Sequence, residues 1–205
     1  MPSIISYDPP DSVRDTKGFE RFLREHVLPL GRGRKNVQIS EGEVIIEGNR
    51  PGMLSLAANL IGPALTRLLE FRLEPVEELD PPGGWFGDLE PNSPTLLIER
   101  IGSPLHRPNG FHYEVPPFRI ENRPAMDYGS VIDLAIDRYE SNLEAVVRGT
   151  ASALLSLAKQ AIYFSQAPER SRIAFGKYEG IRDERNRLVF ESTVFAEDVP
   201  WAKFP

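Results

Sequence analysis

The chain has no cysteine among its 205 residues, which excludes a disulfide scaffold, thiolate catalysis and cysteine-ligated zinc. It also lacks any apolar run near the roughly 18 residues that a membrane-spanning helix needs. Its first residues show no basic region followed by an apolar segment, the pattern of a secretory signal. We therefore expect a cytoplasmic protein with no membrane contact.

The chain also lacks an excess of positive charge and any known catalytic motif. The formal net charge is −6, and a protein that binds nucleic acid broadly needs a basic face to displace counterions. No HExxH, GxSxG, Walker-type loop, dinucleotide fingerprint or EF-hand pattern occurs. We therefore expect no nucleic-acid partner, no cofactor and no metal, and we favour a binding protein over an enzyme.

The most strongly specified stretch is Glu43–Leu69. Its β-branched residues at 44–46 favour a strand, and Gly48-Asn49 tolerates the left-handed backbone of a turn. Pro51 suits the first turn of a helix, and apolar residues then recur at three- and four-residue steps. The pattern predicts a helix over about 52–70, kinked or broken at Gly62-Pro63.

A second periodic segment covers 130–166 and predicts the other main helix. Unbroken, that helix would be on the order of 55 Å long, whereas a compact chain of this size is roughly 43 Å across. We therefore expect a bend or break around Gly149-Thr150. The alternative is a protruding helix through which the protein forms a homo-oligomer.

Shorter patterns predict strands around the two helices. Residues 37–39 pair with 44–46 as a hairpin, and further strands are expected at 71–76, 95–101, 111–115 and 118–121, with a last hairpin of 172–178 and 187–195. The order predicts an α+β fold with antiparallel sheets, in which an N-terminal lobe (1–124) packs as one unit with a second lobe (125–205). We find no residue-level repeat that proves a duplication.

Part of the chain resembles a family of predicted immunity proteins of bacterial polymorphic toxin systems. The resemblance covers about 37–101 and rests on Gly48-Asn49, Gly52-Met53, Leu56-Ala57 and Leu60, then on Leu79-Asp80, Leu89-Glu90-Pro91, Ser93 and the strand 96–99. Glu77 and Glu78 stand where members often carry histidines. The resemblance implies a protein that neutralises a toxin by covering it.

The candidate contact surface is an acidic stripe on the second predicted helix. Asp133, Asp137, Glu140 and Glu144 follow at steps of four, three and four, so a helix would present them on one face. Such a stripe could meet the basic cleft of a toxin, and a solvated helix face is the alternative reading. Trp85, in the glycine-rich loop 81–87, either anchors a partner or packs under its own loop.

A second hypothesis is a small enzyme or ligand-binding protein that uses the loop around 100–123. This region combines histidines and arginines that could form a phosphate or metal pocket or act as a general acid and base. They are Arg100, His106, Arg107, His112 and Arg119. A third hypothesis is a structural or assembly protein that oligomerises through the long helix.

Overall fold

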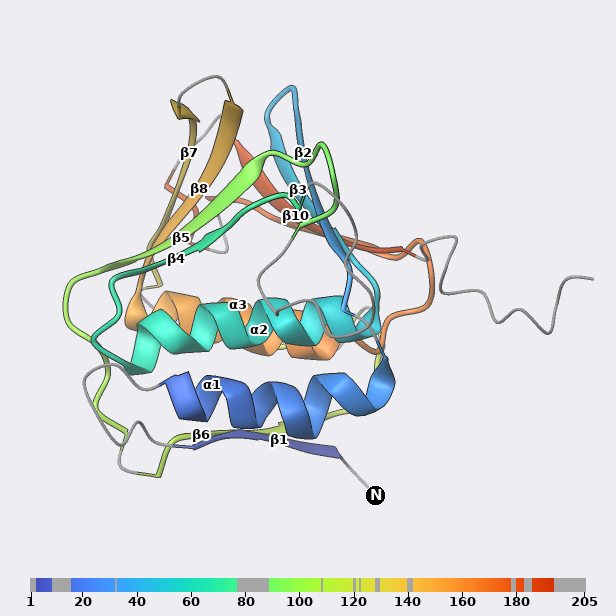
Figure 1. Ribbon diagram of the computed structural model, residues 1–205, viewed down its shortest axis with the longest axis vertical. Helices are drawn as coiled ribbons and strands as arrows, with labels where there is room; N and C mark the ends of the chain where they lie inside the picture. The colour runs from blue at the N-terminus through green and yellow to red at the C-terminus, as the bar shows by residue number, and fades with distance from the viewer. Residues whose placement is uncertain are drawn as a thin grey trace, which may run out of the picture.

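The computed structural model describes residues 3–8, 16–31, 33–76, 89–107, 109–119, 121, 123–127, 130–139, 142–177, 180–182 and 186–193. Two four-stranded sheets converge at one side of the molecule and separate at the other, where the helices α2 (Arg50–Leu65) and α3 (Ala151–Phe164) lie between them (Figure 1). The protein is therefore an α+β fold with a helical middle layer.

One sheet has the order β2 (Lys35–Ser40), β3 (Glu43–Gly48), β10 (Arg187–Ser192) and β9 (Arg172–Phe175). The other has the order β4 (Glu70–Leu73), β5 (Thr95–Ile101), β8 (Asn142–Thr150) and β7 (Ile132–Tyr139). Strands β3 and β10 are parallel, as are β5 and β8, while the remaining neighbours are antiparallel hairpins. Each sheet thus combines a hairpin from the first half of the chain with one from the second.

This topology is an internal repeat of the unit hairpin, helix, hairpin. The first unit is β2-β3-α2-β4-β5 and the second is β7-β8-α3-β9-β10, and the two exchange their last hairpins between the sheets. The repeat is also visible in the residues at a separation of 101 positions, contrary to our reading of the sequence. Between positions 43 and 61 the identical pairs are Glu43 and Glu144, Gly48 and Gly149, Leu54 and Leu155, Ser55 and Ser156, Leu56 and Leu157, Ala57 and Ala158, and Ile61 and Ile162.

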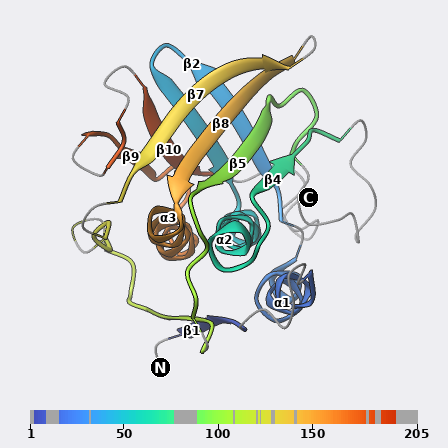
Figure 2. The ribbon, with the colours of Figure 1, turned by 90° about the vertical axis from the view of Figure 1, so that its left-hand side faces the viewer.

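The middle layer forms because both helices are apolar around almost their whole circumference, as is usual for a helix covered on all sides. In α2 every residue from Pro51 to Leu65 is buried. The two helices lie side by side, and below them are α1 (Thr16–Phe22), a π-helical turn (Leu23–Val27), a 3-10 turn (Leu28–Leu30), and a two-stranded sheet of β1 (Ser3–Tyr7) and β6 (Phe111–Val115) (Figure 2). The inner faces of both large sheets and both helices contribute to one hydrophobic core.

The entry into α2 differs from the expected left-handed turn. Asn49 has extended backbone angles and is the N-cap of the helix, because its Oδ1 accepts hydrogen bonds from Gly52 N at 2.8 Å and Arg34 N at 2.9 Å. Gly52 is required by a close approach, since a Cβ there would lie 2.0 Å from the carbonyl oxygen of Arg34. The helix continues through Pro63 to Leu65, so the predicted break at Gly62-Pro63 is wrong.

The predicted long helix over 130–166 is wrong in its first half. Residues 132–139 and 142–150 form the hairpin β7-β8, and only 151–164 are helical. Gly149-Thr150 is a true boundary: Thr150 ends β8 and caps α3 by accepting a hydrogen bond from Ala153 N. The strand predicted at 118–121 is also absent from the described residues of that segment, whereas the strands at 95–101 and 111–115 are confirmed.

Candidate functional site

The outer face of the β4-β5-β8-β7 sheet gathers most of the acidic residues that we singled out. The register places Asp133, Arg148, Glu99 and Glu70 in one row across the four strands, and Asp137 beside Glu144 in another. We call this surface the acidic face and define it by five acids and two arginines, namely Glu70, Glu99, Asp133, Asp137, Glu144, Arg72 and Arg148.

Three of the four predicted stripe residues therefore share one face, although they lie on strands and not on a helix. Asp133 and Asp137 are four residues apart on β7, and their side chains lie on the same side of the strand because residues separated by an even number of positions share a face. Glu144 is their neighbour on β8. Glu140 lies outside the described residues, as does Trp85.

Ion pairs neutralise only part of the acidic face. Arg148 Nε lies 2.5 Å from Glu99 Oε2. This hydrogen bond, together with the nearby charges of Asp137 and Asp133, raises the pKa of Arg148, although its partial burial has the opposite effect. Arg72 Nη1 lies 2.7 Å from Glu144 Oε1, close enough for an ion pair, although that oxygen accepts no well-aligned hydrogen bond. Within the described part of the chain, Glu70 and Asp137 have no cation at ion-pair distance.

The equivalent face of the other sheet is less acidic. Its rows carry three acids, Glu43, Glu47 and Glu191, and two arginines, Arg172 and Arg187. Arg172 forms an ion pair with Glu43. The acidic excess is therefore a property of one sheet and not of the repeated architecture.

The histidine and arginine loop does not assemble as one cluster in the described structure. His106 and Arg107 are exposed after β5, and His112 is exposed on β6, where its Nε2 lies 2.6 Å from the carbonyl oxygen of Asn109. Arg119 is exposed, and its backbone N–H donates to Tyr163 Oη at 2.7 Å. Neither of the two cavities described below is lined by any of these residues.

Arg100, the fifth member of that set, is buried and holds the end of α2. Its Nη1 donates to the carbonyl oxygens of Pro63 at 2.6 Å and Thr66 at 2.5 Å, and its Nε donates to that of Gly102 at 2.9 Å. A cation is favourable there because the last carbonyl groups of a helix carry partial negative charge. Burial lowers the pKa of Arg100, and its hydrogen bonds indicate a structural role.

Sequence reasoning missed a buried polar network at the start of β2. Arg34 forms a two-point ion pair with Glu90, and the ammonium group of Lys35 lies 2.8 Å from Ser55 Oγ and 3.5 Å from Asn59 Oδ1 inside α2. Lys35 is 1% exposed. The polar residues at 55 and 59 in an otherwise apolar helix were the available signal, because a buried polar group needs a partner.

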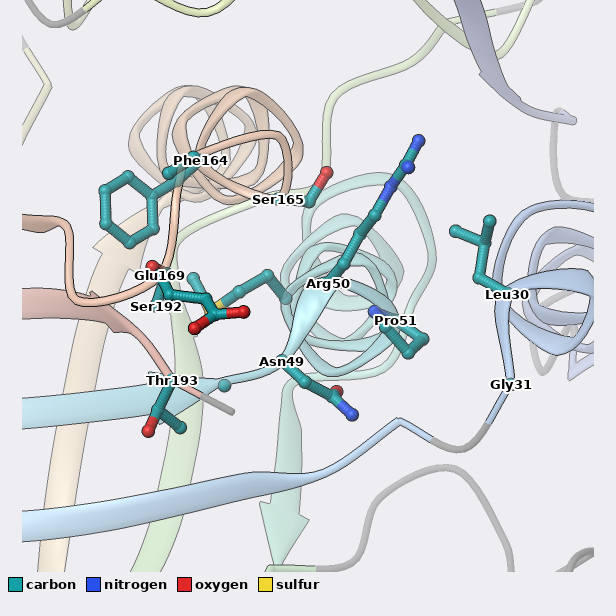
Figure 3. A pocket seen from close by; sticks show the side chains of 13 residues that line it. Leu30, Gly31, Asn49, Arg50, Pro51, Phe164, Ser165, Glu169, Ser192 and Thr193 are labelled. Carbon is teal, nitrogen blue, oxygen red and sulfur yellow. The ribbon is translucent and has the colours of Figure 1, made fainter. Parts of the chain in front are cut away.

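Two adjoining cavities lie where the start of α2 meets the end of α3. The larger, about 480 Å³, is lined by residues of both helix ends and of the β10 terminus, including Asn49, Phe164, Ala167, Glu169 and Ser192. The smaller, about 280 Å³, shares Leu30, Arg50 and Ser165 with it. Figure 3 shows Arg50 extending between Ser165 and Leu30, away from Glu169, Ser192 and Thr193.

Among the described residues, no group of three or more histidine and acidic side chains is arranged to hold a metal ion. In the same part of the chain, no helix is long and apolar enough to cross a membrane. Comparison of the chain with protein-family models, with curated proteins and with solved structures finds no match.

Proposed function

We propose that this chain is a non-enzymatic binding protein of the immunity type, which neutralises a basic protein partner through the acidic face. The observation that carries the proposal is the charge of this face. Five carboxylates and two guanidinium groups stand on one side of four hydrogen-bonded strands, and Asp137 and Glu70 are exposed.

The arrangement suits fast and oriented association. A sheet fixes the spacing of its side chains, so the surface does not need to be ordered when a partner binds. Between the charged rows lie Leu97, Val146 and Ala135, in register across β5, β8 and β7, and Leu97 and Val146 are buried. The face therefore presents mainly charge to a partner, and complementary charge mainly raises the association rate.

The charge-reversal variant Asp133→Lys/Asp137→Lys tests the proposal. Glu144 is left intact because it is buried beside Arg72, so its reversal would test folding and not binding. The matched control is Glu20→Lys/Glu114→Lys, which makes the same charge change at two exposed acids on α1 and β6. Folding of each variant is checked by its thermal unfolding midpoint.

The partner to assay is the product of the gene adjacent to the one that encodes this chain, expressed with and without it. Wild type and the control variant should protect cells and bind the purified partner, and binding should weaken as salt is raised. The Asp133→Lys/Asp137→Lys variant should fold, lose protection and associate at least about tenfold more slowly. Full binding and protection by this variant would overturn the proposal.

A further inference from the structure

The internal repeat places Arg100 and Ser192 at equivalent positions. Arg100 on β5 is paired with Gly149, the residue before the N-cap of α3. Ser192 on β10 is paired with Gly48, the residue before the N-cap of α2. Gly48 and Gly149 are themselves equivalent at the 101-residue separation. One repeat therefore has a long cationic side chain where the other has a small hydroxyl.

The groups that bind the Arg100 guanidinium also have counterparts. Its Nη1 contacts the carbonyl oxygens of Pro63 and Thr66 at the end of α2. The residues 101 positions later are Phe164 and Ala167, at the end of α3. A carbonyl oxygen has two lone pairs, so the Phe164 carbonyl, which accepts one bond from Ala167 N, retains capacity for a second donor.

The place that Arg100 fills in one repeat is open in the other. Phe164, Ala167, Ser192 and Gly48 all line the cavity of about 480 Å³. Ser192 cannot fill it, because its side chain is short and its Oγ donates to the carbonyl oxygen of Pro168. Figure 3 shows Ser192 and Glu169 on one wall and Phe164 at the end of α3 beside them.

We propose that this cavity binds the guanidinium group of an arginine that is not part of the chain, in the way that its counterpart holds Arg100. The end of α3 supplies partial negative charge through its carbonyl groups, and the carboxylate of Glu169 adds a full one. A planar guanidinium, with five donors in a fixed geometry, matches such a set of oxygens better than an ammonium group does. Arg50 also lines the cavity, but its side chain extends away from Glu169 and Ser192, so its own guanidinium lies outside the proposed binding position.

The direct test uses N-acetyl-L-arginine amide as the probe and its citrulline analogue as the control. Citrulline keeps the shape of arginine and lacks its charge. The arginine probe should shift the backbone amide NMR signals of residues 164–169 and 192–193 in a saturable way. The citrulline analogue should bind at least about tenfold more weakly, the difference that one charge-assisted hydrogen bond makes. Equal shifts with both probes, or none with either, would overturn the proposal.

Variants locate the site. Ser192→Arg should fill the cavity from within and abolish the arginine-dependent shifts, while Ser192→Ala should leave them. Glu169→Gln, an exposed substitution, should weaken binding of the arginine probe and leave that of the citrulline analogue unchanged. Undiminished arginine binding by a folded Ser192→Arg variant would contradict the assignment. If that variant does not fold, the Glu169→Gln comparison and the wild-type titration still decide.

The guanidinium could come from an arginine side chain of a protein partner or from a small molecule, and comparing the blocked probe with free arginine separates these two sources. If a protein partner presents it, the blocked probe and free arginine should bind with similar affinity, because the site then contacts only the guanidinium. A free amino acid or a similar small molecule predicts tighter binding of free arginine than of the blocked probe, because the site would then also bind the charged α-amino and α-carboxylate groups that the probe lacks. The acidic face lies on different elements, so this experiment stands apart from the test of the proposed function.

Discussion

Arg34 and Glu90 form a buried two-point ion pair, with Nε 2.7 Å from Oε1 and Nη2 2.6 Å from Oε2. Their side chains are only 9% and 13% exposed, and the pair ties the start of β2 to the turn before β5. Breaking a buried pair leaves a desolvated charge behind, so we expect Glu90→Gln to lower the free energy of unfolding by about 3 kcal/mol.

The comparison for this prediction is the exposed pair of Arg21 and Asp8, whose side chains are 58% and 40% exposed. Asp8→Asn should cost less than about 1 kcal/mol, because solvent screens an exposed pair. Urea unfolding of wild type and both variants at neutral pH gives the two values. Equal losses in the two variants would show that burial of the Arg34 and Glu90 pair does not matter.

Two glycines of α2 are expected to respond in different ways to alanine. The added Cβ of Gly52→Ala would meet the Arg34 carbonyl oxygen at 2.0 Å, so the first turn of the helix must move away from β2, at a cost of about 3 kcal/mol. At Gly62 the nearest atom, on the ring of Phe71, lies 3.6 Å from an added Cβ. Alanine has a higher helix propensity than glycine, but a Cβ on the residue before Pro63 disfavours the α-helical backbone angles. The two effects oppose each other, so Gly62→Ala should change the free energy of unfolding by less than about 1 kcal/mol. Thermal unfolding of the two variants tests the contrast.

The hairpins and single strands were predictable because their signals are local. The alternation at Val37, Ile39, Val44 and Ile46 places one side of β2 and β3 in the core, and the two-residue turn fixes their register. The pairing of β3 with β10 and of β5 with β8 was not predictable in this way. These strands are parallel and far apart in the sequence, so no short turn between them determines their register.

The error over 130–150 has a physical cause. Ile132, Leu134 and Ile136 alternate with Asp133, Ala135 and Asp137, which is the pattern of a strand, but the apolar residues also fit helical spacing when they are read together with α3. Strand β8 adds ambiguity because Ala145, Val146 and Val147 are buried on both faces. For the same reason the acidic face could not be predicted from the sequence, because its residues come from four strands that are adjacent only in the folded protein.

The two helix caps offer a test of how alike the repeats are. Asn49 Oδ1 accepts hydrogen bonds from two backbone N–H groups, those of Gly52 and Arg34, whereas Thr150 Oγ1 accepts from one, that of Ala153 at 3.3 Å. Loss of a cap costs about 1 kcal/mol, and an additional buried donor without a partner costs about 1–3 kcal/mol more. Asn49→Ala should therefore lower the free energy of unfolding by about 3 kcal/mol and Thr150→Ala by about 1 kcal/mol. Denaturant titration of both variants measures the difference, and equal losses would remove the special role of the Arg34 contact.

Tyr113 on β6 gives a prediction for alkaline pH. Burial, followed by the proximity of Tyr163, raises the pKa of Tyr113 from 10 to about 12. Between pH 10 and 12 the folded state therefore retains a proton that the unfolded state releases, so the contribution of Tyr113 to stability is complete below pH 10 and is lost as the pH rises toward 12. The free energy of unfolding should decline over this interval, and the decline should be shallower in Tyr113→Phe. Absorbance titration of the folded protein should show one tyrosine fewer ionising near pH 12 in that variant, and an unchanged titration would assign the raised pKa to another tyrosine.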